Sequence, residues 1–123
     1  MTAALYLAAL LAFVVGLAHS LLGERYILRR LIRRDDLPKL FGETAFTART
    51  LRFAWHITSI AWWGFAVILL QLADGSITAR SVELSIGVTF VATGLIALVI
   101  SRARHLAWLA FLVVGGLALA AGL

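Results

Sequence analysis

The stretch AALYLAALLAFVVGLAHSLL, residues 3–22, decides the fold, because it contains no acidic residue, lysine or arginine. A helix rises about 1.5 Å per residue, so this segment matches the roughly 30 Å hydrocarbon core of a bilayer. Three further apolar stretches follow at 53–72, 84–101 and 105–123. The chain of 123 residues is 63% hydrophobic with a mean hydropathy of +1.00, which is far outside the range of soluble domains.

These stretches predict an all-α integral membrane protein, because only helices satisfy every backbone group within segments so apolar. We expect a single domain, residues 1–123, in which four transmembrane helices form an antiparallel bundle and residues 23–52 form a loop. The first stretch is interpreted as a retained helix rather than a cleaved signal peptide. Its amino end has no lysine or arginine, and a basic block follows it directly.

The basic residues predict the orientation. Ten of them lie in residues 23–52 or in the short turn between the third and fourth stretches, and only Arg80 lies between the second and third. The positive-inside rule therefore places both chain termini outside the cytoplasm. In a bacterium the protein would lie in the inner or plasma membrane.

The segment Glu24–Arg34 has the pattern of a basic amphipathic helix, with apolar side chains on one face and arginines on the other. We expect it either to prolong the first span or to lie along the headgroups and bind anionic phospholipid. Although the pI is near 11, no nucleic-acid partner is expected, because the basic residues adjoin membrane spans.

Small residues at steps of four run along the first span (Ala8, Ala12, Gly16 and Ser20), and such stripes let helices approach closely. They predict close helix packing, and we expect a homo-oligomer or an accessory subunit of a larger membrane complex. Trp62 and Trp63 lie deeper than an interfacial tryptophan and are interpreted as packing bulk or as the wall of a site for a flat apolar ligand.

Three histidines, the only ones in the chain, fall on three spans at a similar depth near the predicted cytoplasmic face: His19, His56 and His105. If their faces converge, they could bind a transition metal with Glu24 as a fourth ligand. Alternatively, His19 and His56 could ligate a b-type haem, with Arg25 or Arg52 near its propionates. The remaining alternative is that the imidazoles are hydrogen-bond partners between helices. With no cysteine in the chain, thiolate sites and disulfides are excluded.

The sequence favours a structural or binding membrane protein, with a metal or haem carrier as a more specific form of it. A small-solute transporter or channel is an alternative. However, the spans contain no acidic residue, lysine or arginine, and the four-span small multidrug transporters depend on an acidic residue in the first helix. A membrane enzyme with acid–base chemistry at the cytoplasmic interface is the other alternative.

Overall fold

The computed structural model describes all 123 residues and is entirely helical. Its elements are α1 (Thr2–Leu22), the π-helical segment η1 (Gly23–Leu28), α2 (Arg29–Leu31), α3 (Ala45–Asp74), α4 (Ala79–Ser101) and α5 (Ala107–Gly122). Three helices are long and apolar enough to cross a membrane: the continuous helix Thr2–Leu31, then α3 and α4. The fourth apolar helix, α5, has 16 residues. The chain is therefore consistent with an integral membrane protein.

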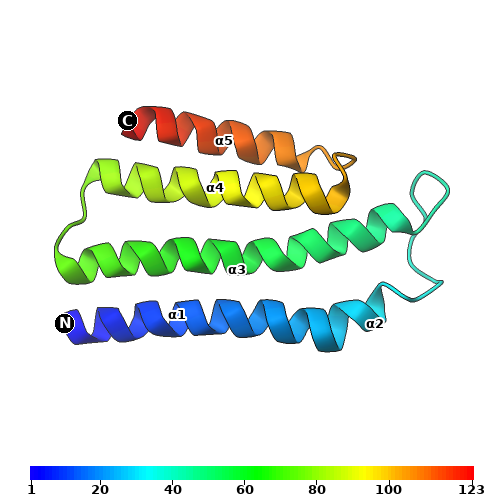
Figure 1. Ribbon diagram of the computed structural model, residues 1–123, viewed down its shortest axis with the longest axis horizontal. Coiled ribbons are helices and arrows are strands. Elements are labelled where there is room, and N and C mark those ends of the chain that lie inside the picture. The colour runs from blue at the N-terminus through cyan, green and yellow to red at the C-terminus, as the bar shows by residue number, and fades with distance from the viewer.

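The four main helices lie side by side in one flat, antiparallel row in the order α1, α3, α4, α5 (Figure 1). Each helix packs on its neighbours in the row, so the helices enclose no common core, and only 14 of 123 residues are buried. A bundle around a shared centre, as expected from the sequence, is not seen. The physical reason is that lipid is as apolar as leucine, so helices gain little by enclosing a core and associate through local close contacts.

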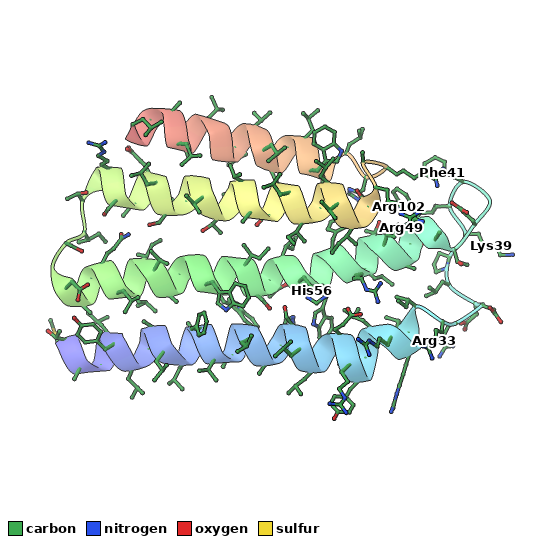
Figure 2. The ribbon with its side chains drawn as sticks, viewed as in Figure 1. Arg33, Lys39, Phe41, Arg49, His56 and Arg102 are labelled. Carbon is green, nitrogen blue, oxygen red and sulfur yellow. The ribbon has the colours of Figure 1, made fainter.

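The two ends of the row differ in charge. The N- and C-termini and the α3–α4 loop lie at one end, here called the terminal end (Figure 1). The loop between α2 and α3 and the turn between α4 and α5 lie at the other, here called the basic end. Arg33, Lys39, Arg49 and Arg102 gather there (Figure 2). The basic end carries ten basic and four acidic side chains, whereas the terminal end carries one basic side chain, Arg80, and two acidic ones, Asp74 and Glu83.

The basic segment prolongs the first helix instead of lying apart from it. Residues 2–31 form one continuous helix whose hydrogen bonding changes to the π type at Gly23–Leu28. Leu28 is almost fully buried, at 1% exposure. Of the two positions expected from the sequence for this segment, the structure therefore has the prolongation, and the helix ends at Leu31 rather than Arg34.

Other boundaries differ from the sequence expectation, and α4, for example, begins at Ala79 rather than at residue 84. Helix α3 begins at Ala45, eight residues before the predicted span at 53. The predicted span starts later because it is defined by apolar residues, and the first turns of α3 carry Arg49 and Arg52. The last helix begins at Ala107 rather than His105. Arg102 and Ala103 have left-handed backbone angles (φ of 52° and 63°), which end α4 and make a turn that includes His105.

Glycines set how closely neighbouring helices approach. On α1, Gly16 lies under the Trp63 indole, whose Nε1 donates a hydrogen bond to the Phe13 carbonyl at 3.1 Å. In the α4–α5 hairpin, a Cβ added at Gly94 or Gly115 would lie within 3 Å of a side chain on the partner helix. Contacts this close give helices dispersion energy and backbone proximity that larger residues would prevent.

Candidate functional site

A polar cluster joins α1 and η1 to α3 near the basic end. It consists of Ser20, Glu24, Arg52, His56 and Ser59, and we call it the interfacial cluster. Arg52 donates two hydrogen bonds to the Glu24 carboxylate, from Nη2 to Oε1 at 2.6 Å and from Nε to Oε2 at 3.2 Å. Such a bidentate pair is the strongest arrangement for these groups.

His56 lies between Ser20 and Glu24 and is bonded to both. Its Nδ1 is 3.0 Å from Ser20 Oγ, and its Nε2 is 3.1 Å from Glu24 Oε2. Ser20 in turn donates its hydroxyl hydrogen to Ser59 Oγ at 2.7 Å, and Ser59 is fully buried. Both ring nitrogens of His56 therefore have a hydrogen-bond partner within the cluster.

The order carboxylate, imidazole, hydroxyl also occurs in serine hydrolases, in which the hydroxyl is the nucleophile. Ser20 lines neither of the two cavities at this end of the row, which are described below. A nucleophile needs a space beside it for the carbonyl it attacks. The geometry therefore favours a cluster that holds α1 against α3.

His19 lies on the same turn of α1 as Ser20 but points to a different side. Its ring stacks on Trp55, with centroids 4.4 Å apart and planes 4° apart, and meets Trp62 edge-on at 5.0 Å. Its Nε2 is buried and has no hydrogen-bond partner. The Trp55 indole donates from Nε1 to the His19 carbonyl at 2.9 Å.

His105 lies in the turn between α4 and α5, where it contacts the start of α3. Its ring stacks on Phe46 and meets Phe53 edge-on, with centroids 5.5 and 5.0 Å apart. Its Nδ1 accepts a hydrogen bond from the Ala107 amide at 3.2 Å, at the beginning of α5. Next to it, Arg104 pairs with Glu43 at 2.7 Å. His105 thus joins the α4–α5 turn to the start of α3.

The structure does not bring the three histidines together, and no group of three or more His, Asp or Glu side chains is placed to hold a metal ion. Glu24 and His56 are neighbours, but His19 and His105 point elsewhere. Both nitrogens of His56 are hydrogen-bonded, to Ser20 and to Glu24. Counting residues along a helix gives the depth of a side chain but not the direction in which it points. Metal or haem binding stays an untested prediction.

Two adjoining cavities flank the prolonged first helix. The first, about 400 Å³, is mainly apolar and is lined by His19, Trp55, Trp62, Tyr26 and neighbouring aliphatic residues; we call it the indole groove. The second, about 650 Å³, is lined by Leu21, Leu22, Glu24, Arg25 and Arg29; we call it the basic cavity. Leu22 lines both, so the apolar and the charged cavities are neighbours at this side chain.

The charges of the basic cavity are not balanced. Glu24 is taken up by Arg52 and His56, and Arg29 is 3.8 Å from it with a side chain 63% exposed. Arg25 makes no ion pair and lies over the Tyr26 ring, 5.4 Å from its centroid. Farther along, the Arg34 guanidinium holds the pKa of the Asp36 carboxyl below its usual range. The cavity therefore retains net positive charge.

Sequence reasoning placed Glu24, Arg52 and His56 in one region but missed the pairing of indoles with glycines. The spacing of these residues in the sequence could have indicated the pairing. Gly16 and Gly23 are seven residues apart on the first helix, and Trp55 and Trp63 are eight residues apart on α3. These spacings, each about two helical turns, put each pair on one face.

Comparison with protein-family models, with curated proteins and with solved structures gives no match to this chain.

Proposed function

We propose that this protein is a small membrane protein of the binding type that holds an anionic phospholipid at the cytoplasmic leaflet. The observation that carries the proposal is the junction at Leu22, where the basic cavity meets the indole groove. A lipid needs both kinds of surface, a cationic one for its phosphate and an apolar one for the start of its acyl chain.

The phosphate would bind to Arg25 and Arg29. Guanidinium groups suit phosphate because their planar donors match its oxygens, and each arginine near a membrane surface contributes about 1 kcal/mol toward anionic lipid. Arg25 is free of carboxylate partners, and Arg29 is only loosely held by Glu24 at 3.8 Å. The interfacial cluster would keep Glu24 from competing, since Arg52 and His56 already satisfy its carboxylate.

The acyl chain would lie in the indole groove. Its wall of Trp55, Trp62 and Tyr26 offers flat apolar surface, and tryptophan and tyrosine suit the boundary between headgroup and hydrocarbon. The groove extends along the first helix from Ile27 to Val15, away from the basic end. The acyl chain would therefore run into the hydrocarbon core.

This proposal includes a membrane topology in which all four helices cross the bilayer and both termini lie outside the cytoplasm. The composition of α5 supports a fourth crossing, because residues 105–123 contain no acidic residue, lysine or arginine, although its 16 helical residues extend about 24 Å, less than the roughly 30 Å of an average hydrocarbon core. Association into a homo-oligomer or with a larger membrane complex stays a prediction, and mass photometry in nanodiscs would test it.

The test uses the full chain in nanodiscs of phosphatidylcholine containing a minority of phosphatidylglycerol. Native mass spectrometry of the released protein should detect retained phosphatidylglycerol above its share of the bilayer. The Arg25→Gln/Arg29→Gln variant should bind phosphatidylglycerol about thirtyfold more weakly, because it loses about 1 kcal/mol at each arginine, and the enrichment should disappear. Arg80→Gln, which removes one positive charge at the terminal end, should keep it. Equal enrichment in all three proteins, or none in the unaltered chain, would refute a site at the basic cavity.

A further inference from the structure

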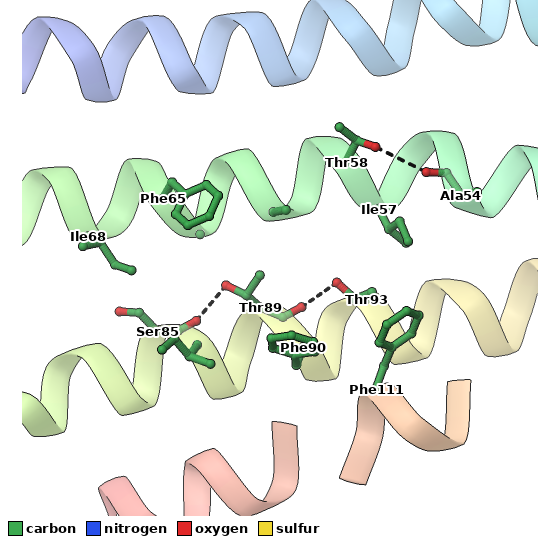
Figure 3. Close-up of a pocket in the computed structure, with 13 residues that line it drawn as sticks. Ala54, Ile57, Thr58, Phe65, Ile68, Ser85, Thr89, Phe90, Thr93 and Phe111 are labelled. Carbon is green, nitrogen blue, oxygen red and sulfur yellow. Dashed lines mark hydrogen bonds between the residues drawn. The ribbon is translucent and has the colours of Figure 1, made fainter. Parts of the chain in front are cut away.

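A third cavity lies deeper in the row, between α3 and α4, and is separate from the two cavities at the basic end. It has a volume of about 470 Å³, within the range of small-molecule sites. Its walls carry Phe65 from α3, Phe90 from α4 and Phe111 from α5 (Figure 3). Its lining also includes the small residues Ala61 and Gly64. We call this the α3–α4 groove.

The polar groups of the α3–α4 groove are all hydroxyls, and every one uses its hydrogen inside its own helix. Thr93 donates to the Thr89 carbonyl at 2.8 Å, and Thr89 donates to the Ser85 carbonyl at 2.7 Å (Figure 3). Ser85 donates to the Ser81 carbonyl at 2.7 Å, and Thr58 to the Ala54 carbonyl at 3.3 Å. No charged side chain and no amide side chain lines the groove.

The hydroxyl oxygens of this groove can therefore accept hydrogen bonds, but they donate to a ligand only by giving up an intrahelical bond. A hydroxyl has two acceptor lone pairs and one hydrogen. Ser85 already accepts from Gln71 Nε2 at 2.9 Å, whereas the Thr58, Thr89 and Thr93 oxygens accept no hydrogen bond from within the protein. A ligand with O–H donors matches this lining, whereas a ligand that offers only carbonyl or ether oxygens does not.

We propose that the α3–α4 groove binds a flat phenolic molecule of hydroquinone type from within the bilayer. The phenylalanine walls suit an aromatic ring, which prefers offset or edge contacts with other rings. The ring hydroxyls would donate to Thr89 and Thr93, which lie one turn apart on α4. The oxidised quinone has the same shape but only acceptor oxygens, so the groove distinguishes the two by hydrogen-bond polarity. A lipid acyl chain has no donor and gains nothing from the row of oxygens.

The test compares three probes of nearly identical shape: decyl-hydroquinone, its dimethyl ether and decyl-quinone. Binding to the full chain is measured by calorimetry in detergent under anaerobic, reducing conditions for the hydroquinone, with partition into empty micelles subtracted. The hydroquinone should bind saturably and about tenfold more tightly than the ether and the quinone. Only the hydroquinone can donate two hydrogen bonds to the threonines, and each such bond in apolar surroundings contributes well under 2 kcal/mol. Equal binding of hydroquinone and ether, or no saturable binding, would overturn the proposal, since the groove would then hold only apolar bulk.

Two variants locate the site. Thr89→Val/Thr93→Val keeps the shape of the lining and removes both acceptors, so it should abolish the preference for hydroquinone while leaving weak binding of all three probes. Ala61→Phe should fill the groove and block binding, whereas Leu117→Phe, on the exposed face of α5, should not. If Ala61→Phe fails to fold, the nearly isosteric valine pair still decides the question. An unchanged preference in the valine pair would exclude this groove as the site.

Discussion

The indole of Trp55 lies directly against Gly23 and donates a hydrogen bond to the carbonyl of His19, four residues earlier on the same helix. A Cβ added at Gly23 would overlap the indole ring, because the three heavy atoms nearest to that Cβ position all belong to Trp55. The backbone of Gly23 has ordinary right-handed helical angles, φ −60° and ψ −47°. The glycine is therefore needed for space and not for an unusual conformation.

Substituting Gly23→Ala should destabilise the packing of α1 on α3. Alanine has the higher helix propensity by about 1 kcal/mol, so a purely local effect would stabilise the protein. The overlap with Trp55 opposes this and should dominate, with a net loss of about 1–3 kcal/mol. The free energy of unfolding, measured by steric trapping in bicelles, reports the difference.

Gly116→Ala is the matched control, because a Cβ there meets nothing within 4 Å. It should leave stability unchanged or raise it slightly. If Gly23→Ala behaved like Gly116→Ala, the close contact between Trp55 and Gly23 would not exist in the bilayer.

The Glu24–Arg52 pair should contribute more to stability than the exposed pair Glu43–Arg104. Both pairs have one hydrogen bond near 2.6–2.7 Å, but the Glu24 side chain is 24% exposed against 49% for Glu43. A double-mutant cycle with glutamine at each position should give a coupling of about 1–3 kcal/mol for the first pair. The second should give about 0–1 kcal/mol, as exposed ion pairs do. Couplings of equal size would show that the interfacial cluster is as solvated as the surface.

The helices could be predicted from hydropathy, but not their ends or their arrangement. A window that scores apolar residues stops at the arginines of α3, although α3 already begins at Ala45 and includes Arg49 and Arg52, because arginine is a good helix former. The turn at Arg102 and Ala103 depends on left-handed backbone angles, and neither residue is a glycine, so the sequence contains no signal for this turn. The flat row follows from which helix faces carry glycines opposite large side chains, and this requires the partner helix to be known.

For the candidate site, the residue types and their depth could be predicted from the sequence. Ser20 and His56 do lie at one level, and Glu24 and Arg52 do lie beside them. What it lacked was the rotation of each helix about its axis, which directs His19 to Trp55 and His105 to Phe46. A helix places successive side chains about 100° apart, so a modest error in rotation changes the partner completely.

The contact between α3 and α4 should respond to a compensating pair of substitutions at Gly64 and Thr89. A Cβ at Gly64 would overlap the Thr89 side chain, so Gly64→Ala should cost about 1–3 kcal/mol of unfolding free energy. Truncating the neighbour in the variant Gly64→Ala/Thr89→Ala removes the overlap and should recover a large part of that loss. Thr89→Ala alone should destabilise mildly, so recovery in the double variant would be specific to the contact. A double variant less stable than Gly64→Ala would place the two residues apart.

Reporter fusions should place the basic end in the cytoplasm. Alkaline phosphatase is active only after export, so it should be active when fused after Leu123 or after Gly75 and inactive when fused after Gly42. The reason is the charge difference between the ends: ten basic side chains lie at the basic end and Arg80 alone at the terminal end. Green fluorescent protein at the same positions should give the opposite pattern. Activity at Gly42 alone would invert the orientation and move the proposed lipid site to the outer leaflet. Activity at Gly75 without activity at Leu123 would show that the short helix α5 leaves the C-terminus in the cytoplasm, so that three helices rather than four cross the membrane.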